Sequence, residues 1–452
     1  MWACRSLLMM SRPRNLLNSI RRRRAVTEPP AVALGAAASR WLVSDTRDSD
    51  LLHDDAMDNA AVSSPRRNDG DPGTSTALAD RRRTATEEIK KHLYLVLDDV
   101  KDGFGIHKLD MDTDDVAAGG LDSGNLPRLP NPPVLRLDEK WIDDFAVLGS
   151  NVIGMGSRLT NTHNDERRDD GDTLTFDTRT GKLALLPDLP DGLRNNMPMH
   201  CIAAGDRLYV IEAGTMYDGA NYDNEFFMGG LHCLKLHPQG DDAIAHAGYP
   251  KREPGCCDPQ KLPLSPYGIT AHAVHPSGRA FFVSAYCHRG WGTFWYDTEL
   301  GDWTRHCSLK LPFIGQAHYD QDLNAWVGLH AQRDGHICAC DVPDLNRPAA
   351  PEWKFGKEKL FYEDPERHVD AKLVAMGGGG RFCIVEIMTM PGVDRKGCIG
   401  DGDKCVLRLT AFRVEYDDDG ELTVTDRRPA CWFMMSKYRD YAYSDSWLAF
   451  WA

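Results

Sequence analysis

A stretch of apolar residues long enough to cross a bilayer is missing from this sequence of 452 residues. The longest candidates, such as residues 145–156, match the length of two short strands, whereas a spanning helix needs about 20 residues. Positive charge is scarce too, because 53 Lys and Arg face 67 Asp and Glu and the formal net charge is −14. We therefore expect a soluble chain with no membrane span, and we exclude proteins that coat nucleic acid or an anionic membrane.

The motifs of several enzyme classes are also missing. No Gly-x-Ser-x-Gly motif is present, and the glycine-rich residues 154–161 and 377–381 lack the lysine and helix of a phosphate-binding loop. We expect Gly377 to Gly380 to form a hairpin tip instead. The sequence thus gives no catalytic residue and no cofactor-binding residue.

A metal site is not predicted either. His336, Cys338 and Cys340 alternate along a predicted strand and share one face, but no further ligand cluster follows at the spacing of a zinc site. His272 and His275 stand three apart near a predicted hairpin, where they need not face one another. We interpret His336, Cys338 and Cys340 as one buried strand face, and His272 and His275 as core or surface histidines.

Thirteen cysteines, an odd number, occur without a short apolar segment that ends in a signal-peptide cleavage site. This pattern predicts free thiols in a reducing, intracellular compartment. Unpaired cysteine is among the most often buried residue types. We expect buried thiols at seven positions: Cys201, Cys233, Cys287, Cys338, Cys340, Cys383 and Cys431.

Residues 1–90 differ in composition from the rest of the chain. They hold 15 basic and 12 acidic residues, whereas residues 91–452 carry a net charge of −17. The first 27 residues contain seven Arg and no acidic residue, which fits an organellar transit peptide, a nuclear-import cluster at Arg21 to Arg24, or a solvated tail. Residues 43–88 have almost no aromatic residue, so we predict a disordered tail and linker over residues 1–90. The expected location is the cytoplasm or nucleus, with mitochondrion or plastid as alternatives.

A recurring pattern begins near residue 91, where an apolar stretch, a tight polar turn and a second apolar stretch follow one another. The turns contain Ser-Asn, Gly-Asp, Ser-Gly, Leu-Asn or Gly-Gly, which suit the reversal of a strand. We therefore predict five β-hairpins, at residues 145–157, 201–213, 272–286, 317–331 and 373–388.

Each hairpin is followed by a further strand that ends in an acidic or turn residue, and a shortened version of the pattern stands at residues 92–112. Six units of roughly 60 residues, with about four short strands each and little helical periodicity, predict an all-β fold, a six-bladed β-propeller over residues 91–452. A β-sandwich is the alternative fold, because it also contains short strands at such spacing.

The two ends of this region suggest how the ring closes. The first unit has only two clear strands, whereas residues 420–426 and 427–435 form two strands beyond the last unit. We expect these C-terminal strands to complete the first blade and so remove an open sheet edge.

A spaced aromatic pair points to a known repeat. Tyr296 and Trp303 lie on either side of a turn in WYDTELGDW, and Phe176 and Leu183 repeat the spacing. This pattern resembles the second half of a kelch repeat, and the resemblance implies large side chains that pack between neighbouring blades.

A wider resemblance covers about residues 92–435. Residues 92–112, 129–138 and 176–190 together resemble a large plant family, expanded in grasses, of kelch-like proteins of unknown function. The resemblance implies a six-bladed propeller of the galactose-oxidase and kelch superfamily, and it brings no established activity.

One predicted loop, residues 214–230, is rich in aromatic and acidic residues. Aromatic residues on a loop are typical of recognition surfaces, because they supply contact area at low entropy cost. Tyr217, Tyr222, Phe226 and Phe227 are therefore candidate recognition residues, and the alternative is that their rings cap the core of a blade.

These observations favour a non-enzymatic scaffold whose loops bind a protein or peptide with a neutral or basic surface. One alternative is an enzyme that acts on a small molecule or glycan at the mouth of the central channel. Another is the substrate-recognition module of a ubiquitin ligase, although residues 1–90 lack the apolar periodicity of a helical adaptor domain.

Overall fold

The structure is a computed structural model of the chain, which divides into two units, Met1–Glu88 and Ile89–Ala452. The described residues all belong to the second unit, so the predicted tail and linker lie outside them, Lys90 excepted. The described ranges are 90–99, 103–111, 126–130, 132–137, 142, 144–156, 173–186, 189, 193, 198–212, 229–236, 244–246, 262–287, 290–307, 310–345, 350–393, 400–438 and 447–452.

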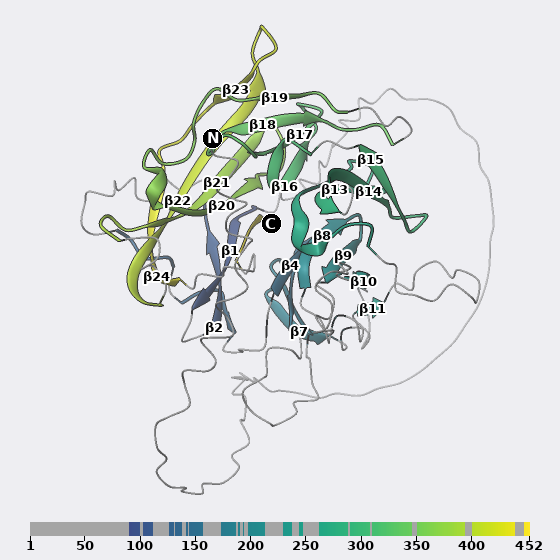
Figure 1. The fold of residues 1–452 in the computed structure, drawn as a ribbon. Coiled ribbons are helices and arrows are strands. Elements are labelled where there is room, and N and C mark those ends of the chain that lie inside the picture. The colour runs from purple at the N-terminus through teal and green to yellow at the C-terminus, as the bar shows by residue number, and fades with distance from the viewer. Residues whose placement is uncertain are drawn as a thin grey trace, which may run out of the picture. The chain divides into compact units, whose positions relative to one another are not determined.

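Strands dominate these residues and form successive units of four antiparallel strands (Figure 1). The first three units are β25(Leu448–Trp451)-β1(Leu93–Asp99)-β2(Gly103–Leu109)-β3(Leu135–Leu137), β4(Asp144–Leu148)-β5(Asn151–Met155)-β6(Thr173–Asp177)-β7(Lys182–Leu186), and β8(Pro198–Ala204)-β9(Arg207–Glu212)-β10(Leu231–Leu236)-β11(Ile244–His246). The next two are β12(Ile269–Val274)-β13(Ala280–Cys287)-β14(Gly290–Asp297)-β15(Asp302–Cys307) and β16(Phe313–Asp320)-β17(Ala325–His330)-β18(Ile337–Asp341)-β19(Trp353–Phe355). The last is β20(His368–Ala375)-β21(Arg381–Thr389)-β22(Gly400–Tyr416)-β23(Leu422–Thr425), with β24(Cys431–Tyr438) also paired to β22.

The innermost strands of these units meet in a closed cycle. β25 contacts β4, and the contacts continue through β8, β12, β16 and β20 back to β25. β12 and β16 approach closely enough to pair in parallel, Ala271 opposite Gly315 and Ala273 opposite Ala317. Antiparallel four-stranded sheets whose first strands surround one axis form a β-propeller, so the all-β propeller prediction is confirmed. We call each four-stranded unit a blade, numbered from the one that contains β1.

The five predicted hairpins are confirmed as the first two strands of blades two to six. Their turns use the small residues that the sequence offered: Gly205 and Gly278 have positive φ, and so does Asn324. The outer hairpins are fixed by aspartate, since Asp297 Oδ1 accepts the backbone N–H groups of Glu299 and Leu300, both at 2.8 Å.

Closure of the ring differs in detail from the prediction. The strand that completes the first blade is β25, and the strands predicted for this place, residues 420–426 and 427–435, do not take part. β25 pairs with β1, where Ala449 stands opposite Leu95. Those two strands, β23 and β24, remain in blade six because β22, with 17 residues, is long enough to pair with both along its length. The backbone of Ala452 exchanges two further hydrogen bonds with His92.

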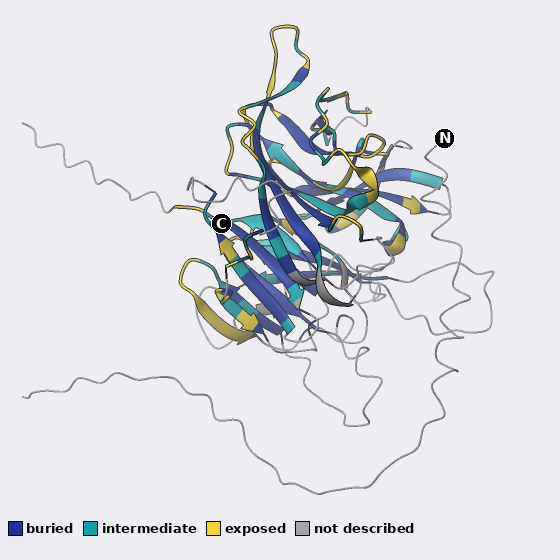
Figure 2. Cartoon of the chain, turned by 90° about the vertical axis from the view of Figure 1, so that its left-hand side faces the viewer, coloured by how far each residue is buried: buried dark blue, intermediate teal, exposed yellow. Residues whose placement is uncertain are grey.

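The core lies between the blades, where buried side chains from neighbouring sheets meet (Figure 2). Tyr296 stands opposite Trp303 across β14 and β15, with their ring centroids 5.1 Å apart. Phe281 lies 5.2 Å from the Tyr296 ring, and Tyr209 of blade three lies 5.1 Å from Phe281. Aromatic pairs at these separations add to the burial of apolar area, so this cluster joins blade three to blade four.

Candidate functional site

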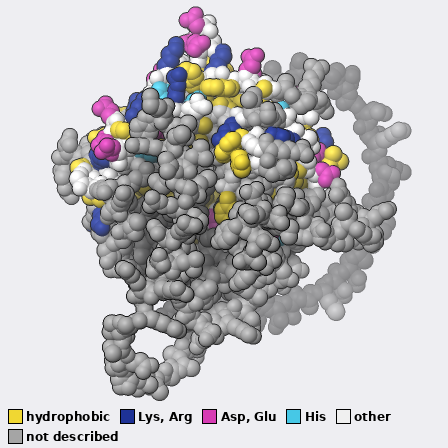
Figure 3. All heavy atoms as spheres, in the orientation of Figure 1, with side chains coloured by type: hydrophobic (Ala, Val, Ile, Leu, Met, Phe, Trp, Pro, Cys, Tyr) yellow, Lys and Arg dark blue, Asp and Glu magenta, His cyan; other side chains and the backbone are white. Residues whose placement is uncertain are grey.

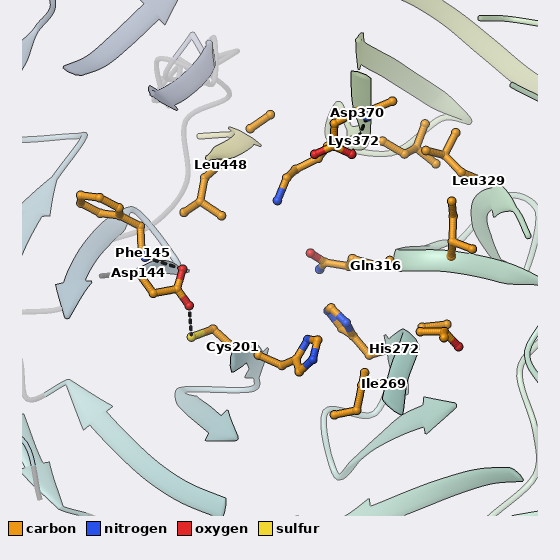
Figure 4. Close-up of a pocket in the computed structure, with 18 residues that line it drawn as sticks. Asp144, Phe145, Cys201, Ile269, His272, Gln316, Leu329, Asp370, Lys372 and Leu448 are labelled. Atoms are coloured by element: carbon orange, nitrogen blue, oxygen red, sulfur yellow. Dashed lines mark hydrogen bonds between the residues drawn. The ribbon is translucent and has the colours of Figure 1, made fainter. Parts of the chain in front are cut away.

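The first residues of the innermost strands surround a cavity of about 350 Å³, which we call the central cavity (Figure 4). Side chains alternate along a strand, so each innermost strand directs every second residue near its start toward the axis. The chemically distinctive lining residues are Asp144, His200, Cys201, His272, Gln316, Asp370 and Lys372. The volume falls within the range of small-molecule sites, about 300–1,000 Å³.

Asp144 and Cys201 link blades two and three at this cavity. Asp144 is 9% exposed, and its Oδ1 accepts the backbone N–H of Phe145 at 2.8 Å. Its Oδ2 accepts the Cys201 thiol at 3.8 Å. A reactive thiolate is stabilised by a neighbouring cation, and Cys201 faces a carboxylate instead, so the pair is suited to joining strands rather than to nucleophilic attack.

Asp370 and Lys372 lie two residues apart on β20 and are both organised by Trp447, which is 4% exposed. The Trp447 indole Nε1 donates to Asp370 Oδ2 at 2.7 Å, while Asp370 Oδ1 accepts the backbone N–H of Ala371 at 2.8 Å. Lys372 Nζ lies 5.0 Å from the centroid of the Trp447 ring, a cation–π distance. Figure 4 shows the Lys372 side chain reaching into the central cavity.

Histidines lie on four of the innermost strands, among them His200 on β8, His272 on β12 and His318 on β16. His200 Nε2 lies 3.2 Å from the carbonyl oxygen of Pro266, and Figure 4 shows His272 facing the cavity beside Gln316. His318, two residues after Gln316 on β16, donates from Nε2 to the carbonyl oxygen of Leu373 at 2.8 Å. Burial lowers the pKa of His318, and the hydrogen bond to Leu373 acts in the opposite direction.

Large apolar side chains are exposed beside the mouth of the cavity, on blade four and the start of blade five. Tyr286 is 50% exposed, Ile314 47% and Tyr267 39%. Trp291 stands opposite Tyr286, with ring centroids 5.6 Å apart, and Lys310 Nζ lies 2.9 Å from the Trp291 centroid. We call these five residues the aromatic rim; it meets the cavity at Ile314, which lines both.

The described surface also carries exposed hydrophobic side chains next to Lys and Arg on the face that Figure 3 shows. Scattered exposed apolar residues are ordinary in soluble proteins, whereas a contiguous group beside a cavity is more often a contact surface. The aromatic rim is of the second kind, because the Tyr286 and Trp291 rings pack together and Ile314 belongs to the cavity wall.

A second cluster of charges is buried inside blade six. Glu386 is 0% exposed and Arg408 6% exposed, and Arg408 Nη1 donates to Glu386 Oε2 at 2.9 Å and to the carbonyl oxygen of Leu360 at 2.8 Å. Glu386 Oε1 lies 3.0 Å from His368 Nδ1, and its Oε2 accepts the backbone N–H of Tyr362 at 3.2 Å. We call these residues the buried ion network.

The predicted recognition residues Tyr217, Tyr222, Phe226 and Phe227 lie outside the described residues. The same holds for residues 255–260, which contain adjacent cysteines. Within the described part, His272 and His275 are not brought together: His272 lines the cavity, and His275 Nδ1 lies 2.7 Å from Ser277 Oγ in the β12–β13 turn.

The cysteines of β18 and β21 are core residues, as the sequence indicated. Cys338 and Cys340 are 0% exposed and pack among aromatic and alanine side chains. Burial raises the pKa of the Cys338 thiol, and it raises the pKa of Cys383 to about 12. His336 faces the carbonyl oxygen of Gly356 at 3.0 Å rather than a ligand set.

Among the described residues, no three His, Cys, Asp or Glu side chains gather in an arrangement that could hold a metal ion. No helix of the described ranges is long and apolar enough to span a membrane.

Sequence reasoning missed Asp370, Lys372 and Gln316, although the innermost strands carry a signal. The first strand of each hairpin contains polar residues at alternate positions, as in HVDAKLVA, whereas the second strand is almost wholly apolar, as in RFCIVEIMT. Because a first strand faces the axis on one side, alternate polar residues there mark the lining of the cavity.

These features define the class of protein: an all-β propeller with a polar central cavity. A model of the family DUF1668, described as a protein of unknown function, matches residues 90–432, and the chain belongs to this family.

Solved structures with the same general architecture are only distantly similar. TolB from Acinetobacter baumannii is 11% identical, with 80% of this chain and 66% of that chain covered and a TM-score of 0.37. A putative 6-phosphogluconolactonase from Bacteroides fragilis is 11% identical over 75% of this chain and 82% of that one, with a TM-score of 0.38. The Cps50 (Swd1) β-propeller domain from Myceliophteria thermophila is 10% identical over 64% and 87%, with a TM-score of 0.29. No curated protein matches this chain.

Proposed function

We propose that this protein is a non-catalytic binding propeller whose cavity-bearing face receives part of another protein. The observation that carries the proposal is the aromatic rim, where Tyr286 and Ile314 expose about half of their surface beside the central cavity. Exposed aromatic side chains next to a recess combine contact area with a pocket for an anchoring group, the arrangement that dominates binding energy at interfaces.

The predicted recognition loop supports the same face. Residues 214–230 connect β9 to β10, and the anchoring residues Glu212 and Gly230 are joined by a backbone hydrogen bond of 3.0 Å. Gly229 packs so tightly that a Cβ there would lie 2.5 Å from Pro266 Cγ, in the short helix Pro266–Gly268 that precedes β12. Tyr267 of the aromatic rim belongs to that helix, so the described residues that flank the loop, Glu212 and Gly229, lie beside the rim.

Three finer aspects of the proposal rest on the sequence. A kelch relation is supported by the packing of Tyr296 and Trp303 between blades, and membership of a grass-expanded plant family rests on the resemblance of the motifs alone. A reducing intracellular compartment is supported by buried free thiols such as Cys233 and Cys287.

Site-specific photo-crosslinking in an extract of the source cells tests the proposal. A benzoylphenylalanine at position 286 lies in the aromatic rim. The same residue in place of Leu300, which is 69% exposed in the turn between β14 and β15, serves as the matched control. We expect a discrete crosslinked protein from position 286 that disappears in Trp291→Ala, and no such species from position 300. Equal crosslinking at the two positions, or none at position 286, would overturn the proposal.

The cavity volume favours a second candidate, the binding and conversion of a small molecule at the channel mouth. Asp144 and Asp370 are the carboxylates available there, and both already accept two hydrogen bonds. Turnover of a glycan or small molecule by the purified protein, abolished by Asp370→Asn, would establish the enzymatic candidate in place of the scaffold.

A further inference from the structure

The carboxylates of the central cavity are satisfied, whereas two of its side chains that can donate are not. Each oxygen of Asp144 and of Asp370 accepts a hydrogen bond from a described residue. In contrast, the Lys372 ammonium forms no salt bridge with a described residue, and the Gln316 amide forms no hydrogen bond with one. Both groups project into the cavity in Figure 4.

Unsatisfied donors in a recess select a ligand that accepts hydrogen bonds. Resting on the proposed binding function, we propose that the cavity holds a carboxylate group of the ligand, with one oxygen accepting from Lys372 Nζ and the other from the Gln316 amide. A charge-assisted hydrogen bond of this kind is shorter and stronger than a neutral one. Trp447 is the positioning residue, because its ring lies against Lys372 and its N–H holds Asp370.

The charge balance of the lining separates this ligand from two others. A dianionic phosphate would bring two negative charges between Asp144 and Asp370, where Lys372 is the one lysine or arginine of the described lining, whereas a carboxylate brings one. A cationic ligand would need carboxylate oxygens with free capacity, and those of Asp370 are already directed to Trp447 and to the backbone.

The same carboxylate chemistry has two possible sources. A peptide can present it, at its C-terminus or on a Glu side chain, while the rest of the peptide lies along the aromatic rim. A small free organic acid also fits a cavity of about 350 Å³. The experiment below has an arm for each source.

Affinity selection with the full-length protein tests the carboxylate site. Immobilised protein is incubated with three degenerate hexapeptide pools. The first has no acidic residues and a free C-terminus, the second is the same pool with an amidated C-terminus, and the third is amidated and contains one Glu in each peptide. Succinate, and spermidine as a cationic probe, are titrated separately by saturation-transfer NMR. Lys372→Met and Gln316→Leu remove the donors, and Lys108→Met is the matched control, since Lys108 Nζ lies over the Tyr94 ring at 5.8 Å, away from the cavity.

We expect a carboxylate-bearing pool or succinate to bind the wild-type protein, and Lys372→Met to weaken that binding by about tenfold or more, the effect of a hydrogen bond to a charged group. Gln316→Leu should weaken it less, and Lys108→Met should not change it. Binding of no carboxylate probe, unchanged binding in Lys372→Met, or preferential binding of spermidine would overturn the inference. Crosslinking at position 286 that persists in Lys372→Met would then show that the aromatic rim functions without a carboxylate site.

Discussion

Blade six contains two clusters in which a carboxylate and a basic side chain occur together. The clusters differ in whether the basic side chain forms a salt bridge. In the buried ion network, Glu386 accepts from Arg408, from the backbone of Tyr362 and, when its ring N–H points there, from His368. At the central cavity, Lys372 has an aromatic face beneath it and forms no salt bridge with a described residue. The first cluster stabilises a sheet, because every charge is matched; the second retains capacity for a ligand. The predictions below change one region at a time, from the largest expected effect to the smallest.

Removal of residues 447–452 should have the largest effect. It deletes Trp447 and β25, and therefore opens the ring at β1 and the cavity at β20. We expect the protein to unfold at a lower temperature or to aggregate, because the exposed edge of β1 is a template for pairing. Differential scanning calorimetry measures the effect, and a truncated protein that melts like the intact one would contradict ring closure through β25.

Glu386→Gln tests the buried ion network. The substitution leaves the Arg408 charge buried at 6% exposure without its anion, and loss of one partner of a buried pair costs about 3–5 kcal/mol. Urea unfolding measures the free energy, and the double variant Glu386→Leu with Arg408→Met should recover part of the loss, since it leaves no unpaired charge. A cost below about 1 kcal/mol for Glu386→Gln would show that the network is not structural.

Trp447→Phe affects the cavity cluster with most of the apolar packing retained. The variant loses the 2.7 Å hydrogen bond to Asp370 and part of the ring beneath Lys372. We expect a destabilisation of about 1–3 kcal/mol from the lost hydrogen bond and the volume removed. A larger loss of unfolding free energy than in Glu386→Gln would show that the cavity cluster contributes more to stability than the buried ion network.

The pH dependence of stability tests His318, which joins β16 to β20 through Leu373. Because burial holds the pKa of His318 below its unfolded value of about 6.5, the unfolded chain binds the proton first, so stability falls as the pH drops below 6.5. His318→Gln keeps a donor for Leu373 and removes this titration. The slope of unfolding free energy between pH 6.5 and 5 should flatten by at most about 1.4 kcal/mol per pH unit, and an unchanged slope would contradict a lowered pKa of His318.

Lys372→Met should change stability least. A partly buried ammonium on an aromatic ring contributes about 0.5–1 kcal/mol, and the methionine side chain replaces its apolar contact. The difference in unfolding free energy should therefore stay below about 1 kcal/mol. A loss comparable to that of Glu386→Gln would show that Lys372 is a structural residue.

The sequence was sufficient for the fold because the signals of a propeller are local. Apolar stretches flanking Gly205, Gly278 and Asn324 predict hairpins, and the spacing of Tyr296 and Trp303 predicts a cross-strand pair that packs between blades. The closing strand was misplaced because β25 has four residues and its partner β1 lies at the other end of the propeller sequence.

The candidate site could not be predicted from local sequence patterns, because its residues are also far apart in the sequence. Trp447 and Asp370 are 77 residues apart, and the meeting of Gln316 with Lys372 depends on two different blades. The buried pair of Glu386 and Arg408 also has no local signal, since each residue has apolar residues on both sides in its strand. Only the register of β21 with β22 places the two opposite one another. Local periodicity shows which side of a strand faces the axis. It does not show which strands contribute side chains to the same site.

Chemical labelling of the native protein compares the two regions most directly. Acetic anhydride modifies accessible lysines, phenylglyoxal modifies accessible arginines, and peptide mass spectrometry reports the extent of reaction at Lys372 and Arg408 in one preparation. We predict that Lys372 is acetylated in the native protein and Arg408 remains unmodified until the chain unfolds. An unreactive Lys372 together with a modified Arg408 would contradict the assignment of the cavity as the available site and of the ion network as the structural one.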